Sequence, residues 1–235
     1  MNRLAVMSLV AALSSFGVAQ TFNVGFESPA YTAGALNGQN GWFASAGMDV
    51  STDMALSGSQ SLRISGSGDK LAFFGFGSPM SGDITGMTSI FIDPASADPD
   101  RVYGLQVWSG GFNTVLNVSL AADGSVRGGN GLVFDDPILG SISNATGRWI
   151  SVGFNFSTGT SDAVLTVDGQ NFNVSGIGNV ADISDVDVVS RWINNSSTEG
   201  IAYFDDYMVT NAVPEPATMI GLSALGALIL RRRKR

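Results

Sequence analysis

The middle of the chain consists of short segments in which apolar and polar residues alternate. Residues 61–65 (SLRIS) place Leu62 and Ile64 on one face and Arg63 on the other, and residues 149–156 (WISVGFNF) repeat this pattern. Gly, Ser, Asn and Asp separate such segments every few residues, and no stretch holds a helical period for long. A period of two is the pattern of a β-strand with one buried face. The chain is therefore predicted to be all-β.

The predicted strands are spread over the whole central region. They cover residues 21–27, 48–51, 61–65, 70–75, 87–92, 102–108, 114–120, 149–156, 163–167, 170–174, 186–192 and 201–209. Asp168-Gly169 joins two of them and is the strongest hairpin signal in the chain. Gly128-Gly129 lies in a glycine-rich connection between strands. So many short strands with turns between them predict a two-sheet antiparallel sandwich.

The first 19 residues have the pattern of a secretory signal peptide. Arg3 supplies the positive charge, residues 4–18 are mostly apolar, and Gly17-Val18-Ala19 offers small residues to a signal peptidase. Cleavage is predicted after Ala19. A first transmembrane helix is the alternative, although the apolar run is short and ends in a cleavage site. The folded domain is then predicted to span residues 20–212, which is long enough for a full-sized core.

The last 23 residues, 213–235, have three parts in order. Val213-Pro214-Glu215-Pro216 comes first, and its two prolines hold the backbone extended, so the domain is predicted to end before them. An uncharged run, 217–230, follows and is predicted to be an apolar helix. It is shorter than the roughly 20 residues that cross a bilayer comfortably. The chain ends with five cations that stay on the cytoplasmic side, Arg231, Arg232, Arg233, Lys234 and Arg235. Together these parts predict a marginal anchor that is suited to transient insertion.

This order of motif, apolar helix and basic block resembles the PEP-CTERM protein-sorting tail of Gram-negative bacteria. The resemblance implies that an exosortase, a membrane enzyme, recognises the tail and processes the protein at or near Val213–Pro216. It also implies export across the inner membrane, at least transient membrane anchoring, and a destination at the cell surface or in the extracellular matrix, often alongside exopolysaccharide. The alternative is an ordinary C-terminal membrane anchor.

Composition excludes several function classes for the domain. Without the two end segments, six Lys and Arg and 19 Asp and Glu remain, so the net charge is −13 and a basic nucleic-acid-binding face is excluded. The chain has no Cys, which rules out disulfides and thiol chemistry. It has no His, which removes the Ser-His-Asp triad and the usual zinc ligands.

A second resemblance covers most of residues 20–210. It is to the concanavalin-like jelly rolls, which include laminin-G-like and carbohydrate-binding modules. The motifs that carry it are Phe26-Glu27, Gly38-Gln39-Asn40-Gly41-Trp42, Ser57-Gly58-Ser59-Gln60-Ser61-Leu62, Arg148-Trp149, Val167-Asp168-Gly169 and Phe204-Asp205-Asp206-Tyr207. This resemblance implies that the sandwich is a jelly roll, but a fold does not by itself give a function.

The same resemblance implies a structural calcium ion between the first and last strands. Its side-chain ligands would be Glu27 and Asp205, with backbone oxygens from Ser57 or Gln60 and with water completing the six to eight oxygens that calcium takes. Asp206 alternates to the other face. The alternative is that Asp205 and Asp206 lie beside a turn and that Glu27 is solvated.

Two tryptophans are candidates for sugar binding, because aromatic faces stack on sugar rings. Trp42 and Trp108 border glycine-rich loops, whereas Trp149 and Trp192 lie in alternating strands and are predicted to be core or sheet cover. The alternative for any of them is packing.

Catalysis by paired carboxylates is not predicted. Related jelly-roll glucanases carry two glutamates flanking an aspartate on one strand, whereas here Asp182, Asp185 and Asp187 occur without a glutamate. The chain is predicted to be a non-catalytic surface or matrix protein with polysaccharide as its candidate ligand. The alternatives are a polysaccharide-active glycoside hydrolase or lyase of the same fold and a purely structural adhesin.

Overall fold

The computed structural model describes residues 19–131, 136–193 and 199–212. Gln20–Asn211 forms a compact unit. The predicted signal peptide up to residue 18, the sorting motif Val213–Pro216, the predicted apolar helix and the basic block Arg231–Arg235 lie outside the described residues. No helix among the described residues is long and apolar enough to cross a membrane.

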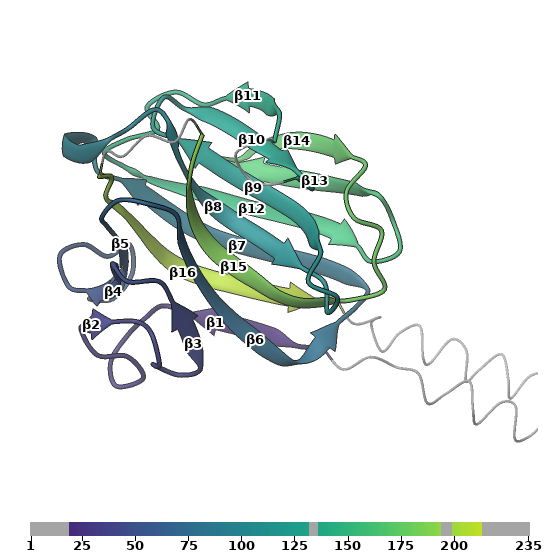
Figure 1. The fold of residues 1–235 in the computed structure, drawn as a ribbon, viewed down its shortest axis with the longest axis horizontal. Helices are drawn as coiled ribbons and strands as arrows, with labels where there is room; N and C mark the ends of the chain where they lie inside the picture. Colours follow the sequence, from purple (N-terminus) through teal and green to yellow (C-terminus); the bar gives the residue numbers. More distant parts are fainter. Residues whose placement is uncertain (1–18, 132–135, 194–198, 213–235) are drawn as a thin grey trace, which may run out of the picture. The chain divides into compact units, whose positions relative to one another are not determined.

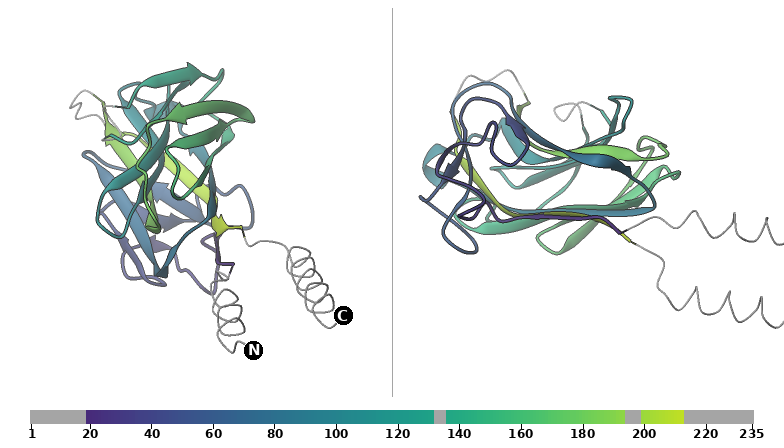
Figure 2. Two further views of the ribbon diagram at one scale, coloured as in Figure 1. Left: turned by 90° about the vertical axis from the view of Figure 1, so that its right-hand side faces the viewer. Right: turned by 90° about the horizontal axis from the view of Figure 1, so that it is seen from below.

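The unit is a sandwich of two antiparallel sheets, and Figure 2 shows them as two layers. One sheet has nine strands, in the order β14 (Gln170–Ser175), β13 (Asp162–Val167), β12 (Trp149–Ser157), β7 (Asp83–Ile92), β16 (Ala202–Asn211), β5 (Ser61–Ile64), β4 (Met48–Ser51) and β2 (Gly34–Ala35), with β1 (Thr21–Val24) also paired to β16. The prediction of an all-β, jelly-roll-like sandwich is confirmed.

The other sheet has seven strands and lies in front in Figure 1. Its order is β11 (Ile138–Ser141), β10 (Ser125–Gly129), β9 (Thr114–Ala121), β8 (Arg101–Trp108), β15 (Ile183–Trp192), β6 (Lys70–Met80) and β3 (Trp42–Ala44). A single short 3₁₀ helix among the described residues, η1 (Pro94–Ser96), precedes β8. The chain passes repeatedly between the two sheets, because β6 and β15 of one sheet are followed in sequence by β7 and β16 of the other.

The core lies between the sheets and follows the alternation seen in the sequence. Leu62 and Ile64 of β5 are fully buried, as are Ile150 and Val152 of β12, whereas Arg63 and Asn155 face outward. Each sheet thus contributes every second side chain to one apolar layer. Burial of this layer is the main force that holds the domain together, since the chain has no disulfide.

The predicted hairpin at Asp168-Gly169 joins β13 to β14. Asp168 has φ +53° and Gly169 has φ +76°, and two positive φ angles define the turn whose twist matches a two-residue hairpin. Arg148 also donates two hydrogen bonds to the Asp168 carboxylate, at 2.9 and 2.6 Å.

The glycine pair Gly128-Gly129 ends a strand, β10, and does not lie in a connection as predicted. The reason is that side chains of other segments approach these two glycines closely. A Cβ at Gly128 would lie 2.2 Å from Leu165 Cδ1, and one at Gly129 would lie 2.5 Å from Asp136 Oδ1. Glycine at these positions therefore marks tight packing, not a turn. Three other short strands were also not predicted, β2, β3 and β11.

The two ends of the domain meet at one place. β1 pairs with the end of β16, the Asn211 N–H donates to Gln20 O at 3.2 Å, and the Gln20 N–H donates to Asn211 Oδ1 at 2.7 Å. Residues 20 and 211 of the domain are therefore held next to each other by these two hydrogen bonds.

Candidate functional site

The outer face of the seven-stranded sheet carries a group of polar side chains, several of which are buried. On β8, β9 and β15 the residues Leu105, Val118 and Val188 point into the core, so their sequence neighbours point away from it. We call the outward-facing polar set the polar strip. It consists of Gln106, Trp108, Asn117, Ser119, Arg127, Asp185 and Asp187.

The strand register brings these residues side by side. Asp187 pairs with Gln106, and Gln106 pairs with Asn117, so three strands contribute one row. Asp185 pairs with Trp108 in the next row, and Ser119 pairs with Arg127 on the other side. Cross-strand neighbours lie about 4.5–5.5 Å apart at Cβ, so the strip is contiguous.

Five buried polar atoms of the strip have no hydrogen-bond partner. They are Trp108 Nε1, Asn117 Oδ1, Ser119 Oγ, Arg127 Nε and Asp187 Oδ1. Buried polar atoms are nearly always paired in native proteins, because an unpaired one costs about 1–3 kcal/mol. Because each of these atoms has almost no accessible surface, buried water is the partner expected for them, and a ligand would contact the half-buried side chains of the strip.

Several hydrogen bonds fix the positions of the side chains in the strip. The Asn117 side-chain amide donates to Gly131 O at 2.7 Å, Arg127 donates to Asp136 O at 3.0 Å, and Arg191 donates to Gln106 Oε1 at 3.3 Å. Asn117 and Ser119 are recessed, with no exposed surface, whereas Trp108, Arg127 and Arg191 are half-buried. A ligand would therefore meet the larger side chains first.

Asp185 and Asp187 form a close carboxyl pair on β15. Burial, together with the nearby Asp185 charge, raises the pKa of Asp187 to about 9, and burial also raises the pKa of Asp185. With this raised pKa, the Asp187 carboxyl is expected to be protonated at neutral pH. The Trp108 indole N–H faces Asp187 without completing a hydrogen bond.

An exposed aromatic pair extends the strip toward the edge of the sheet. Phe43 of β3 stacks on Phe73 of β6, with ring centroids 5.1 Å apart and an interplanar angle of 15°. β6 pairs Gly75 with Asp185 and Leu71 with Val189, which places Phe73 beside Asp187. Phe43 is 60% exposed and offers a flat apolar surface.

The prediction of Trp42 as a sugar contact is wrong. Trp42 is only 1% exposed, its indole N–H donates to the Tyr31 hydroxyl at 3.0 Å, and its ring packs against Phe26 and Tyr207. It points into the core because β3 alternates, and the same alternation turns the next residue, Phe43, outward. Trp108 does lie on the strip, where its role in sugar binding stays a prediction.

Glu27 and Asp205 both hold the loop that precedes β5. The Glu27 carboxylate accepts the N–H groups of Ser59 and Gln60 at 2.8 and 2.7 Å, and these bonds lower its pKa. The buried Asp205 carboxylate accepts the N–H groups of Leu56 and Ser57 at 2.9 and 3.1 Å. The two acids therefore act as a clamp on residues 56–60.

These contacts do not fit a calcium ion that is bound by Glu27, Asp205 and backbone oxygens of Ser57 or Gln60. Ser57 and Gln60 turn their N–H groups, not their carbonyl oxygens, toward the carboxylates, and an N–H repels a cation. Among the described residues no cluster of three or more acids offers another such site. Calcium at Glu27 and Asp205 stays a prediction that these contacts do not support.

We expect a calcium chelator to leave the melting temperature unchanged, because N–H donors already supply the positive partial charge that the carboxylates need. Differential scanning calorimetry with chelator and with added calcium is the measurement. A lower melting temperature in chelator, restored by calcium but not by magnesium, would show that calcium is bound and would contradict this expectation.

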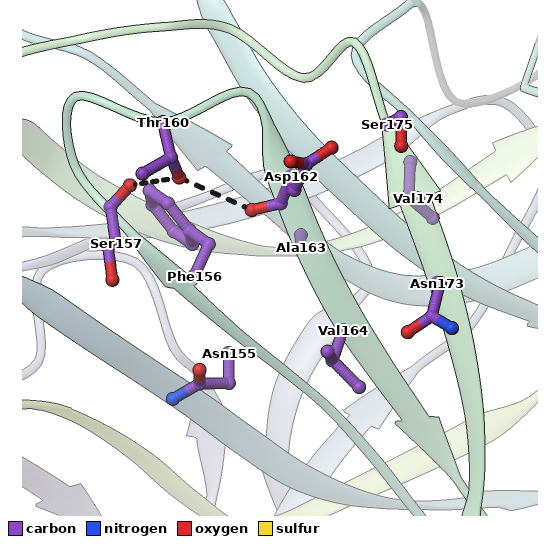
Figure 3. Close-up of a pocket in the computed structure, with 10 residues that line it drawn as sticks. All are labelled: Asn155, Phe156, Ser157, Thr160, Asp162, Ala163, Val164, Asn173, Val174 and Ser175. Atoms are coloured by element: carbon purple, nitrogen blue, oxygen red, sulfur yellow. Dashed lines mark hydrogen bonds between the residues drawn. The ribbon is translucent and has the colours of Figure 1, made fainter.

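A shallow hollow of about 410 Å³ lies on the other sheet, at its β12–β14 edge (Figure 3). Asn155, Asp162 and Asn173 line it, and the Thr160 hydroxyl near it already bonds to Ser157 O at 2.7 Å. Phe156, the one aromatic residue in its lining, is buried with 3% exposure. The hollow therefore lacks the unpaired atoms and the exposed ring that distinguish the polar strip.

Comparison with known families gives a match at the C-terminus. Residues 212–235 match the model of the PEP-CTERM protein-sorting motif. The C-terminal segment is a PEP-CTERM sorting motif. It indicates an exported protein that is anchored transiently in the membrane and processed by an exosortase, a membrane enzyme. No curated protein matches the sequence significantly.

Solved structures share the fold of the domain that precedes the PEP-CTERM motif. The cellulose-induced protein Cip1 has a TM-score of 0.56 at 15% identity, covering 83% of this chain and 100% of its own. An alginate lyase from Chlorella virus has a TM-score of 0.50 at 12% identity, covering 77% and 99%. A sialidase has a TM-score of 0.54 at 12% identity, covering 73% of this chain but only 17% of its own length. At these identities the likeness shows the fold alone.

Proposed function

We propose that the exported domain is a non-catalytic, polysaccharide-binding component of the cell surface or extracellular matrix, and that the polar strip is its binding face. The observation that carries this proposal is the exposed, stacked Phe43–Phe73 pair beside the strip, whose half-buried Trp108 and Arg127 reach the surface. Sugar sites combine a few placed polar groups with apolar contact area, and Phe43 and Phe73 supply the latter beside the strip. The PEP-CTERM motif supplies the export route.

The alternative is a polysaccharide-active glycoside hydrolase or lyase, and the observation in its favour is the Asp185–Asp187 pair. Hydrolysis needs two carboxyl groups about 5–5.5 Å or about 6.5–9.5 Å apart, so that the sugar or a water fits between them. Asp187 is only 2% exposed, so this carboxyl pair has little access to a glycosidic bond. The buried position of the pair therefore favours binding over hydrolysis.

The Phe43→Ala variant separates a ligand-binding role from a purely structural one. Phe43 is 60% exposed, so its truncation removes little buried apolar surface, and we expect the melting temperature to change by no more than a few degrees. Affinity for polysaccharide is expected to fall about fivefold, as for a lost ring contact of about 1 kcal/mol. The measurements are calorimetry and affinity electrophoresis of the mature protein.

The chain offers a matched control for this variant. Ile138 of β11 is 58% exposed and lies at the opposite edge of the same sheet. Ile138→Ala is expected to leave affinity unchanged. Equal binding by the Phe43→Ala variant and the unmodified protein would mean that the aromatic pair takes no part in binding, and this face would then not be the binding face.

A further inference from the structure

The turns at one end of the sandwich lie around Asn211, the last residue of β16. The Asn211 side-chain amide donates to Ser81 O, in the turn between β6 and β7, at 3.2 Å. The strand pairs β6–β15 and β15–β8 carry this end across the other sheet to Trp108, the last residue of β8. The turn between β8 and β9, residues 109–113, therefore lies at the same end of the sandwich as Asn211 (Figure 1).

Phe112 protrudes from this turn, whose other residues are Ser109, Gly110, Gly111 and Asn113 and carry no charge. Its side chain is 88% exposed, the most exposed large hydrophobic side chain among the described residues. Its φ is +58°, in the left-handed region that a bulky side chain rarely adopts. A ring so exposed adds nothing to the core, so packing does not account for this strained conformation. Strain of this kind is typical of side chains that are presented to a partner.

The PEP-CTERM motif limits how far this end of the domain can be from a bilayer. The motif indicates an exported protein that is anchored transiently in the membrane. Residues 212–216 separate Asn211 from the uncharged run 217–230. A fully extended chain of this length spans about 20 Å, so Asn211 lies within about 20 Å of the bilayer while that run is inserted. The turns around Asn211 are then the part of the domain nearest to the tether.

We propose that the 109–113 turn is a membrane contact, in which the Phe112 ring enters the lipid interface and orients the domain while the tail is anchored. This inference does not depend on polysaccharide binding. An apolar ring without hydrogen-bonding groups fits a lipid surface, which needs no shaped pocket. Asp182 lies beside Gly110 of the turn, and the domain has a net charge of −13, so the lipid partner is zwitterionic, not anionic. Burial of the ring favours the oriented state about tenfold, and tethering makes such a weak contact effective.

The test places a fluorescent label beside the ring in the chain that keeps its tail. The chain has no cysteine, so Asn113→Cys gives a single labelling site next to Phe112. Labelled protein, residues 20–235, is reconstituted in phosphatidylcholine vesicles with a lipid-bound nitroxide quencher, and only protein that floats with the vesicles is measured. We expect the label to be quenched. Addition of Phe112→Asn, which tolerates the same φ, should lower the ratio of quenched to unquenched protein about tenfold. Ala97→Cys, exposed in the loop before β8 and so at the opposite end of that strand, is the control and should not be quenched.

Three results would overturn the membrane contact. Quenching at residue 113 that Phe112→Asn does not change, or equal quenching at residues 113 and 97, would mean that the tether alone brings the label to the lipid. No quenching at residue 113 would mean that the turn stays in water. If Phe112→Asn then slowed removal of the tail in the producing bacterium, the turn would contact the processing enzyme and not the bilayer. In phosphatidylglycerol vesicles we expect weaker quenching that recovers at high salt, and stronger quenching there would overturn the assignment to zwitterionic lipid.

Discussion

Replacement of both Pro214 and Pro216 by Ala is expected to leave the protein with its complete C-terminal tail and confined to the membrane fraction. The two prolines lack N–H donors and are predicted to keep the backbone extended between the domain and the predicted apolar run. Alanine favours helix, so the variant would allow the predicted apolar helix to extend toward the domain and remove the extended stretch that a processing enzyme meets. Because processing by an exosortase is what the PEP-CTERM motif implies, the effect should be close to all or none.

The measurement is the intact mass of the protein from the membrane fraction and from the medium. The unmodified protein is expected to lack both its first 19 residues and its tail, and the variant only the first 19. Pro99→Ala, at an exposed position of the domain, is the control and should be processed normally. Tail loss in the double variant at the unmodified level would contradict a role for the prolines, and an unmodified protein that keeps Arg231–Arg235 would be a plain membrane anchor.

The Asp205→Asn variant is expected to melt about 4–16 °C lower than the unmodified domain. The Asp205 carboxylate has no exposed surface and accepts three backbone N–H groups, from Leu56, Ser57 and Asp206, at 2.8–3.1 Å. An amide keeps the shape but presents NH₂ to at least one of these donors, which leaves buried groups unpaired. The cost is about 2–4 kcal/mol, and a domain of this size loses about 2–4 °C per kcal/mol.

Asp206→Asn is the matched control. Asp206 is half-buried, accepts the Ser57 hydroxyl at 2.7 Å, and has φ +51°, a conformation that asparagine tolerates well. Its melting temperature should change by no more than a few degrees. Similar melting temperatures for the two variants would mean that the loop over residues 56–60 does not depend on the Asp205 clamp.

The sequence pattern was sufficient to predict the strands that have one buried face and one solvent-exposed face. Leu62 and Ile64 of β5 follow the period of two directly, and the Asp168-Gly169 turn follows from its demand for two positive φ angles. The pattern fails where close packing between segments determines which residue is needed. Gly128-Gly129 resembles a turn in sequence, yet these glycines make room for Leu165 and Asp136.

The candidate site was harder to predict. The alternation in residues 114–120 does turn Asn117 and Ser119 to the outer face, but any solvated strand gives the same signal. That these two side chains are buried and partly unpaired depends on neighbours from β8 and β10, which only the strand register reveals. In β3, a strand of three residues, nothing local decides whether Trp42 or Phe43 points outward.

The sequence pattern also failed to indicate that one charged residue is buried. Arg101 opens β8 as if it were a solvated cation, yet it has no exposed surface. It donates to Gly66 O at 2.6 Å and to Gly68 O at 3.2 Å, and its guanidinium lies 4.7 Å from the Trp192 ring. Its carbonyl partners come from a loop more than thirty residues away in the sequence. Such partners cannot be inferred from local alternation.

The most direct test of the binding face is the set of tryptophan indole N–H signals in the NMR spectrum of the mature protein, titrated with a neutral oligosaccharide. The four tryptophans lie in distinct places: Trp108 on the polar strip, Trp149 on the outer face of the other sheet, Trp42 in the core and Trp192 against Arg101. A Trp108→Phe variant identifies the Trp108 signal. We predict that the Trp108 signal shifts with saturable dependence on sugar while the Trp42 signal stays fixed. A saturable shift of Trp149 with Trp108 unmoved would contradict the assignment of the binding face to the polar strip.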